Sequence, residues 1–253
     1  MGFINKLKNA WNIFKLSLGL IKKDKSLVAI PIILILSSIL FFIIFFFAFF
    51  ISKGIVLFYW IVFLFFMYFW STFLSSAQSW MIYEVIHGKD TTVLSGIKRA
   101  LKNLKDILIF AVVMLLIKIL ISSIRNKGRL GEILGSILDR FTGIAGRLVL
   151  PAMIVTERNF TDAVKQLKDS LHAIPEIATY ELGIGPLTGL VFFLGILIFI
   201  PMVILNAFIG FLFLIILILL ISIFSTYINN SYYTLLYLSL IEKKKIPELN
   251  ILK

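Results

Sequence analysis

Long apolar runs alternate along the chain with short segments rich in lysine and arginine. Residues 26–52 contain no charged side chain, and thirty uncharged residues follow at 54–83. A third run, 107–124, is interrupted only by Lys118. About 20 predominantly apolar residues are enough to cross the hydrocarbon core of a bilayer. These three runs therefore predict three transmembrane helices.

The second half of the chain predicts three more helices. Residues 131–155 form the weakest candidate, because four charged residues lie within them, Glu132, Asp139, Arg140 and Arg147. Residues 182–241 contain no charge over 60 positions. As one helix they would measure roughly 90 Å, about three times the ~30 Å thickness of the hydrocarbon core. The chain must therefore fold back, and Pro201 to Asn206 is the expected turn. The pattern predicts six transmembrane helices.

The distribution of lysine and arginine over the loops predicts the orientation. Eighteen of the 25 basic residues lie on one side of the predicted helices and four on the other, with three inside the helices. Cytoplasmic loops carry the excess of basic residues in membrane proteins. Both termini are expected to be cytoplasmic, in a multi-pass protein of the cell membrane.

Basic amphipathic segments precede the first, third and fifth predicted helices, which lead away from the cytoplasmic side. Thr91 and Thr161 each begin a segment in which apolar residues recur at i, i+3, i+7 and i+10 beside lysines. This spacing is helical, and threonine is a favourable N-cap. Residues 7–22 form a third version of the pattern. Each segment is predicted to be an interfacial helix that lies at the level of the lipid headgroups.

The second, fourth and sixth predicted helices, which lead back to the cytoplasmic side, also resemble one another. The pairs 75–76 (Ser-Ser) and 229–230 (Asn-Asn) are separated by 154 residues, and neighbouring polar residues match at the same offset. Thr142, Ala145 and Gly146 give a weaker third match. The chain is therefore predicted to be one all-α membrane domain, 1–253, built from three parallel pseudo-repeats in a pseudo-threefold bundle. The units cover about 3–88, 91–156 and 161–241.

The composition supports a membrane protein and limits its partners. Hydrophobic residues make up 60% of the chain and charged residues 15%, and the mean hydropathy is +1.03. Soluble domains are nearer 45–50% apolar and about 25% charged. The net charge of +12 lies in short loops, so anionic headgroups at the cytoplasmic face are the expected partner and nucleic acid is not. With no cysteine and two separated histidines, no metal or cofactor is expected.

Several connections resemble a known family. They are the basic amphipathic lead-in, Pro31 early in the first helix, "EVIHGKDTT…IKRALKNLKDI" and "LVLPAMIVTERNFTDAVKQL". Over roughly residues 10–245 they resemble an uncharacterised family of prokaryotic six-span membrane proteins, a domain of unknown function. The helix-hairpin units are similar to the membrane portion of some glycerophosphodiester phosphodiesterases. The resemblance implies the topology and no activity, because the phosphodiesterase catalytic domain has no counterpart here.

Charged residues within the predicted helices are the first candidates for a site, because each costs about 2.5–3.5 kcal/mol at the centre of a bilayer. Lys118 is expected to extend its ammonium outward or to pair with Asp139. Arg147, with Arg140 one heptad before it, is expected either to pair with Glu84 or Glu181 or to face an anion. A guanidinium has five donors suited to phosphate or carboxylate.

Uncharged polar stripes are the second candidate. Ser75 and Ser76 belong to a stripe on one face of the second predicted helix, and Asn229 and Asn230 belong to a similar stripe on the sixth. Small polar faces allow transmembrane helices to pack closely and to form hydrogen bonds with one another. Alternatively, the stripes border a shared hydrophilic cavity whose positive potential comes from Arg147.

Two functions follow from these candidates. The first is a channel or transporter-like protein for a small anionic or polar solute, as a pseudo-threefold or homo-oligomeric pore or carrier. The alternative is a non-transporting structural, accessory or lipid-binding protein whose polar residues are all paired. An enzyme is not expected, because the sequence has no glycine-rich phosphate loop and no HExxH motif. Intramembrane catalysis by Asp139 with Glu132 is the remaining enzymatic alternative.

Overall fold

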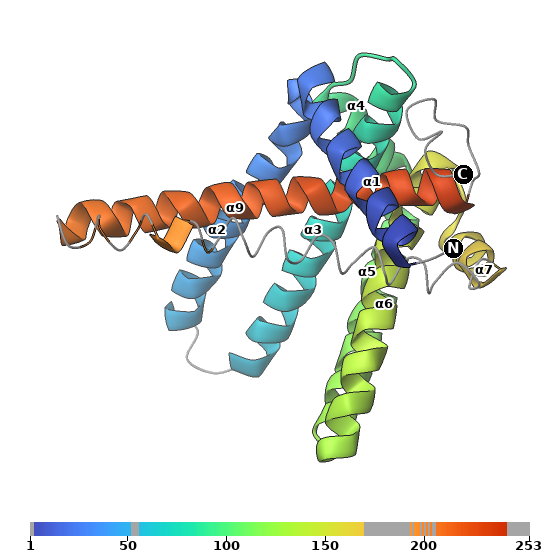
Figure 1. The fold of residues 1–253 in the computed structure, drawn as a ribbon. Helices are drawn as coiled ribbons and strands as arrows, with labels where there is room; N and C mark the ends of the chain where they lie inside the picture. The colour runs from blue at the N-terminus through green and yellow to red at the C-terminus, as the bar shows by residue number, and fades with distance from the viewer. Residues whose placement is uncertain are drawn as a thin grey trace.

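The computed structural model describes residues 3–51, 56–169 and 206–241, with a few positions between 193 and 203. Within these residues the chain is helical and has no strand. Short turns of 3-10 and π helix cover Lys25–Val28 and Tyr237–Ile241. The α-helices (Figure 1) are α1 (Phe3–Lys23), α2 (Ala29–Ile51), α3 (Val56–Ile86), α4 (Val93–Lys102), α5 (Leu104–Arg125), α6 (Arg129–Val155), α7 (Phe160–Asp169) and α9 (Ala207–Leu236).

Four of the described segments are long and apolar enough to cross a membrane. They are Lys25–Phe49, Phe58–Ile86, Leu104–Arg125 and Ala207–Ser239. The described part of the chain is therefore all-helical, and its four long apolar helices are those expected of a membrane protein. Helix α6 has 27 residues but is too rich in charge to join this group. The predicted fifth helix, 182–200, lies mostly outside the described residues, so four of the six predicted spans have support.

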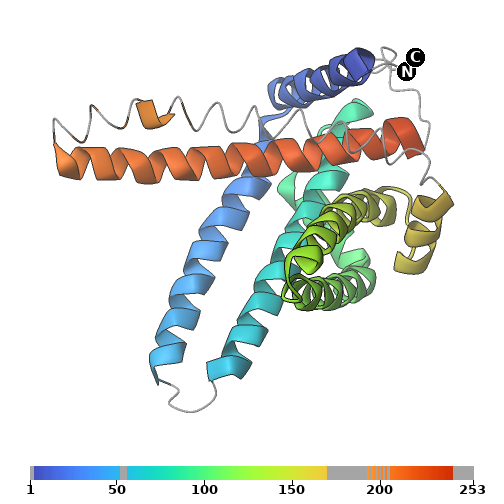
Figure 2. The ribbon, with the colours of Figure 1, turned by 60° about the horizontal axis from the view of Figure 1, so that its bottom comes forward.

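The helices form two hairpins with a third long helix lying across them. The helices of each pair, α2–α3 and α5–α6, run antiparallel, and the two hairpins diverge from one another from the end at which they meet (Figure 1). Helix α9 lies across α2 and α3 in both views and contacts them (Figure 2). In the predicted pseudo-threefold bundle, α9 would instead run alongside the hairpins. Its position is explained by its C-terminal half, which packs against α1, α3 and α6.

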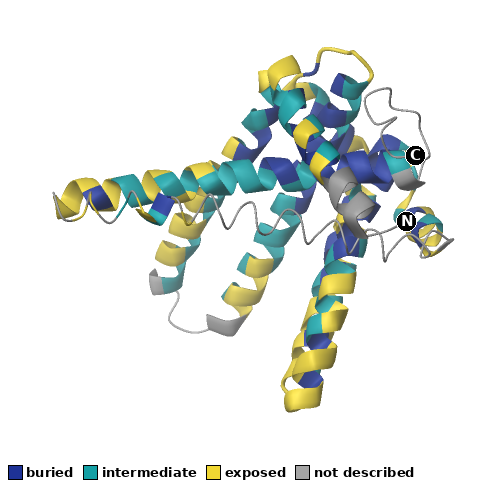
Figure 3. Ribbon diagram, in the orientation of Figure 1, coloured by how far each residue is buried: buried dark blue, intermediate teal, exposed yellow. Residues whose placement is uncertain are grey.

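The core lies at the end where the helices converge. Figure 3 shows buried residues concentrated there and exposed residues along the far ends of both hairpins and α9. The exposed surface is strongly apolar, with Phe47 62% and Phe208 76% accessible. In water such a surface would cost about 25 cal/mol per Å². A hydrocarbon surrounding removes this cost, in agreement with the membrane assignment.

Helices α4 and α7, which lie in the connections, begin close to the predicted positions, but their N-cap residues are not the predicted threonines. Thr92, not Thr91, is the N-cap of α4, in a capping box with Ser95. Helix α7 begins at Phe160, and Asn159, not Thr161, caps it through the N–H of Asp162 at 2.9 Å. The hydroxyl of Thr91 instead donates to the Glu84 carboxylate at 2.6 Å.

Helix α4 packs its glycine and alanine and Arg99 against the protein and leaves two leucines of its amphipathic pattern exposed. Gly96, Arg99 and Ala100 are buried, whereas Leu94 and Leu101 are exposed with the neighbouring lysines. A Cβ on Gly96 would approach the carbonyl oxygen of Ala77 to 2.7 Å, so glycine allows α4 to pack tightly on α3. Gly96, Ala100 and Arg99 thus form the inner face of α4, and Leu94 and Leu101 face outward.

Asp24 links the short connection between α1 and α2 to the connection between α3 and α4. Its carboxylate accepts hydrogen bonds from the N–H of Ser26 at 2.8 Å and of Thr91 at 3.2 Å. The Ser26 hydroxyl donates to the Thr91 carbonyl at 3.3 Å. Partial burial raises the pKa of Asp24, but the hydrogen bonds from Ser26 and Thr91 outweigh it and bring the pKa below its ordinary value.

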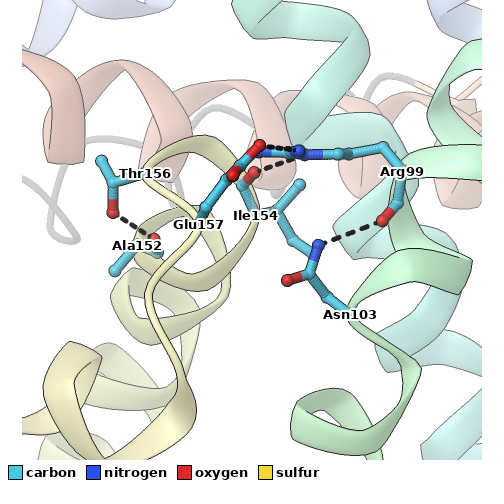
Figure 4. A network of polar contacts seen from close by, with 6 residues as sticks. All are labelled: Arg99, Asn103, Ala152, Ile154, Thr156 and Glu157. Atoms are coloured by element: carbon cyan, nitrogen blue, oxygen red, sulfur yellow. Dashed lines mark hydrogen bonds and ion pairs between the residues drawn. The ribbon is translucent and has the colours of Figure 1, made fainter.

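Arg99 forms a second joint, between α4 and the end of α6 (Figure 4). Its Nε donates to the Ile154 carbonyl at 2.9 Å, its Nη1 pairs with Glu157, and its guanidinium lies 4.3 Å from the centre of the Trp80 ring. The hydrogen bond and charge of Arg99 lower the pKa of Glu157. Glu157 has a φ of 57°, which only glycine adopts without strain. Arg99 therefore holds the chain in the turn that ends α6.

The Asp24 joint predicts a defined loss of stability in acid. Because the folded-state pKa is lowered, the stabilisation is complete above the unfolded-state value and is lost as pH falls through the folded-state pKa. Asp24→Asn should lower the unfolding temperature at pH 7, and its difference from wild type should shrink below about pH 4. Thermal unfolding of detergent-solubilised protein between pH 3 and 7 measures this. Exposed Asp90→Asn is the control, and a pH-independent difference for Asp24→Asn would contradict the assignment.

The Arg99 joint predicts that lysine cannot replace arginine. Arg99→Lys keeps the charge but loses the planar group that bonds Ile154 and stacks on Trp80. We expect a destabilisation of about 1–3 kcal/mol, measured by thermal unfolding in detergent. Lys98→Ala, at an exposed position of the same helix, should change stability by less than about 0.5 kcal/mol. Equal effects of the two substitutions would show that the Arg99 contacts are not stabilising.

Candidate anion cavity

A cavity of about 350 Å³ lies where α3, α5, α6 and α9 meet, and Leu34 of α2 completes its lining. Its walls are mixed. Phe110 and Met114 of α5 and Leu150 of α6 are apolar, whereas α3 and α9 contribute hydroxyl and amide groups. The cavity therefore combines a low-dielectric wall with a polar wall, as small-molecule sites do.

Three helices contribute corresponding positions to this lining. Each of α3, α6 and α9 presents residues at i, i+3 and i+7, which lie on one helical face. The residues are Thr72, Ser75 and Ser79; Gly143, Gly146 and Leu150; and Thr226, Asn229 and Tyr233. The sets on α3 and α9 are separated by 154 residues, the offset of the sequence match. On α6 only Gly146 of the weaker match lines the cavity, so the third unit of the predicted repeat stays a prediction.

Two cationic side chains enter the cavity from the α5–α6 hairpin. The ammonium of Lys118 lies 5.1 Å from the centre of the Tyr68 ring. The guanidinium of Arg147 lies 5.1 Å from the Tyr233 ring, and its Nη1 donates to the Tyr233 hydroxyl at 3.3 Å. Both cations are exposed, so the cavity is open on their side. The described lining contains no carboxylate.

Local packing explains why a long cation fits there. Met114 of α5 lies against Gly146, where a Cβ would approach its Cε to 2.8 Å. A Cβ on Gly143 would meet nothing within 4 Å. Gly146 therefore lets α6 lie close to α5, and Gly143 leaves room beside Arg147. The tyrosine rings add an attraction of about 0.5–2 kcal/mol for each cation.

Side-chain hydrogen bonds hold the polar faces of α3 and α9 together. The amide nitrogen of Asn230 donates to Gln78 Oε1 at 2.6 Å and to Ser75 Oγ at 3.3 Å. The hydroxyl oxygens of Thr234 and Ser79 are 3.1 Å apart. Such contacts stabilise helix pairs in apolar surroundings by about 0.6–2 kcal/mol each. Ser75, Ser79 and Asn230 also line the cavity, so the same polar residues join the two helices and border the cavity.

The structure brings five of the eight predicted site residues to this cavity: Lys118, Arg147, Ser75, Asn229 and Asn230. It does not bring Ser76, Asp139 or Arg140 there. Ser76 is fully buried, and its hydroxyl donates to the Thr72 carbonyl at 2.9 Å. Arg140 lines a separate pocket of about 380 Å³ with Glu132. Tyr68 and Tyr233 were missed by sequence reasoning, because only the fold places their rings beside the cations.

The predicted pair of Lys118 with Asp139 is wrong. Asp139 instead pairs with Arg125 at 2.8 Å. The Arg125 stem lies against Gly135, one turn before Asp139, where the absence of a side chain allows this close contact. Lys118 turns toward α3 instead. Of the two residues named for intramembrane catalysis, Asp139 is held by Arg125 and Glu132 lines the Arg140 pocket.

Of the two predicted partners of Arg147, one is engaged elsewhere and the other is not tested. Glu84 is engaged by the hydroxyls of Thr91 and Ser95 at 2.6 and 2.7 Å, so it does not serve Arg147. The other predicted partner, Glu181, lies outside the described residues. Within the part of the chain that the structure describes, no three histidine, aspartate or glutamate side chains are grouped to hold a metal ion.

Comparison with known proteins adds no relative. The chain matches no protein-family model, no curated protein and no solved structure. These comparisons do not test the family resemblance described above, which stays a prediction.

Proposed function

We propose that this protein is a channel or transporter-like membrane protein for a small anionic or polar solute, and that the cavity is its solute site. The observation that carries the proposal is that Lys118 and Arg147, from different helices, both reach a cavity whose opposite wall is polar. Charged side chains at membrane depth are costly and commonly mark a solute path.

The lining provides groups that can replace the water around an anion. Arg147 and Lys118 supply positive charge, and the hydroxyls of Ser71 and Thr226 face them from α3 and α9. Neither hydroxyl has a hydrogen-bond partner in the described part of the chain, so both are available to a solute. The apolar residues of α5 strengthen these electrostatic attractions by lowering the local dielectric.

The surface of α4 supports a second element of the proposal, binding of anionic headgroups. Leu94 and Leu101 are exposed beside Lys98 and Lys102. Apolar side chains beside lysines are typical of helices at the interface of a membrane with anionic lipids. We place this face, and both termini, on the cytoplasmic side of the cell membrane.

The orientation can be checked with a topology reporter. An enzyme that is active only in the cytoplasm should be active when fused after Lys253, and inactive when inserted between Asn126 and Gly128 in the α5–α6 loop. The basic residues are retained in both fusions, so the positive-inside bias is unchanged. Reversed activities would overturn the orientation, and activity at both positions would show that α5 does not cross the membrane.

Transport itself can be measured in liposomes of neutral phosphatidylcholine by uptake of radiolabelled chloride and phosphate. Arg147→Ala should lower uptake about tenfold or more, because a hydrogen bond to a charged group contributes about 1.5–3 kcal/mol. Arg140→Ala is the matched control, since it removes the same side chain from the same helix outside the cavity. It should leave uptake unchanged.

Folding of each variant is checked by its unfolding temperature and elution profile in detergent. Folded wild-type protein without uptake would contradict transport and favour the structural, accessory or lipid-binding alternative. Uptake equally sensitive to Arg140 and Arg147 would contradict the assignment of the cavity as the solute path.

A further inference from the structure

The far half of helix α6 carries a pocket that is separate from the cavity. Its volume is about 380 Å³, and the residues that line it all belong to α6. Three of them are polar, Glu132, Ser136 and Arg140. They follow one another at intervals of four residues, so they lie along one side of the helix. Figure 3 shows the far half of the α5–α6 hairpin largely exposed, and the pocket is therefore open to the surroundings of the protein.

The two charges of this pocket have no partner in the described part of the chain. Neither Glu132 nor Arg140 forms an ion pair or a hydrogen bond there. Asp139, next to Arg140, is held by Arg125 at 2.8 Å. Glu132 and Arg140 are separated by two helical turns, about 12 Å along the axis. The Ser136 hydroxyl between them also has no hydrogen-bond partner among the described residues.

The position of the pocket along the hairpin places it near a membrane surface. Helix α5 is one of the helices long and apolar enough to cross a membrane, and it ends at Arg125. Gly131 of α6 lies against the carbonyl oxygen of Ile124. The pocket therefore begins at the level where α5 ends and extends toward the bilayer centre. Charged side chains at such a depth are stable with a partner or with water around them.

We infer that this pocket binds the headgroup of phosphatidylethanolamine, with its ammonium on Glu132 and its phosphate on Arg140. This headgroup is zwitterionic, so its two charges match the two unpaired charges of the pocket. A primary ammonium has three N–H donors for carboxylate oxygens, and a guanidinium fits phosphate oxygens. The Ser136 hydroxyl is a further donor for the phosphate. This site is separate from the cavity, and the inference does not rest on transport.

The order of the charges along α6 agrees with their order in the lipid. In a phospholipid the phosphate is joined to the glycerol and acyl chains, and the ethanolamine ammonium is at the end that faces water. Along α6, Glu132 is nearer the tip of the hairpin and Arg140 is nearer the bilayer centre. Side chains in a helix lean toward its N-terminus, which directs the long Arg140 side chain toward the tip. The exposed Ile133 and Ile137 also line the pocket and offer contact to the upper part of the acyl chains.

Other occupants match these charges less well. Phosphatidylglycerol has a phosphate but no cation, so it would leave Glu132 unpaired. Phosphatidylcholine is zwitterionic, but its trimethylammonium group has no N–H to donate. A second copy in the same membrane would be related to the first by an axis along the membrane normal. Its Glu132 would then lie at the depth of the first Glu132, and like charges would meet.

The test measures which lipid lies beside the pocket. The chain has no cysteine, so Leu134→Cys, at an exposed position next to the pocket, provides a single site for a fluorophore. The labelled protein is placed in liposomes of dioleoyl phosphatidylcholine. A small fraction of phosphatidylethanolamine, phosphatidylcholine or phosphatidylglycerol with a nitroxide on its acyl chain is then included as quencher.

A nitroxide quenches only a nearby fluorophore, so quenching reports the local lipid. We expect phosphatidylethanolamine to have an association constant about threefold or more above those of the other two lipids, since an exposed charge pair contributes up to about fivefold. Equal quenching by the three lipids, or stronger quenching by phosphatidylglycerol, would overturn the inference without any further variant.

Variants of the pocket assign the two charges. Glu132→Gln should remove most of the preference for phosphatidylethanolamine, and Glu132→Lys should reverse it in favour of phosphatidylglycerol. Arg140→Gln should lower the association constants of all three lipids to a common value. Arg129→Gln is the matched control, because Arg129 begins the same helix and does not line the pocket; it should leave the preference unchanged. A preference that survives both Glu132 substitutions would overturn the assignment.

A second labelled position separates the pocket from a general attraction of this lipid to the protein. Phe47→Cys lies on the other hairpin, near the end of α2, and is exposed. It should show no preference for phosphatidylethanolamine, and an equal preference there would overturn the site. A loss of quenching by all three lipids at Leu134→Cys as the protein density rises would assign this face to a second copy instead. Unfolding temperatures in detergent confirm that each variant is folded.

Discussion

Close packing against the polar face of α3 is the interaction on which the rest of the structure depends. Helix α3 contacts α1, α2, α4, α5, α6 and α9, and its C-terminal half carries small hydroxyl residues, one alanine and one glutamine on the contact faces. Such residues let helices approach closely where lipid offers no hydrophobic driving force for association. Because these contacts gather at one end of α3, the two hairpins meet there and diverge elsewhere.

The cavity follows from the same packing. Along α3, Gln78 and Ser79 bind α9, whereas Ser71 and Thr72 face a space that α9 does not fill. Glycines at the facing positions of α6 leave that space open, and Arg147 enters it beside them. Packing and a place on the cavity wall are therefore not alternatives for the polar stripes. Ser75, Ser79 and Asn230 form interhelical hydrogen bonds and also border the cavity.

The candidate site was predictable in part. Lys118 and Arg147 are conspicuous in the sequence because charges are rare within apolar helices, and the constant offset between Ser75 and Asn229 indicated that their helices have related faces. Their partners were not predictable. Asp139 pairs with Arg125 because the stem of that arginine lies against Gly135, and the two cations lie over tyrosine rings. Each of these choices depends on which helix lies opposite, and helical spacing does not specify that.

The sequence by itself determined that this is an all-helical membrane protein with basic connections, because hydropathy and charge act locally and need no partner. The tertiary structure decided which side of each helix faces inward and how α9 crosses the hairpins. Helix α4 illustrates the reason. Its apolar spacing predicts an amphipathic helix but not which residues pack on the protein; in the structure Gly96 packs inside and Leu94 faces outward. In a membrane, apolar side chains gain little from turning inward, so close fit and polar contacts select the buried face.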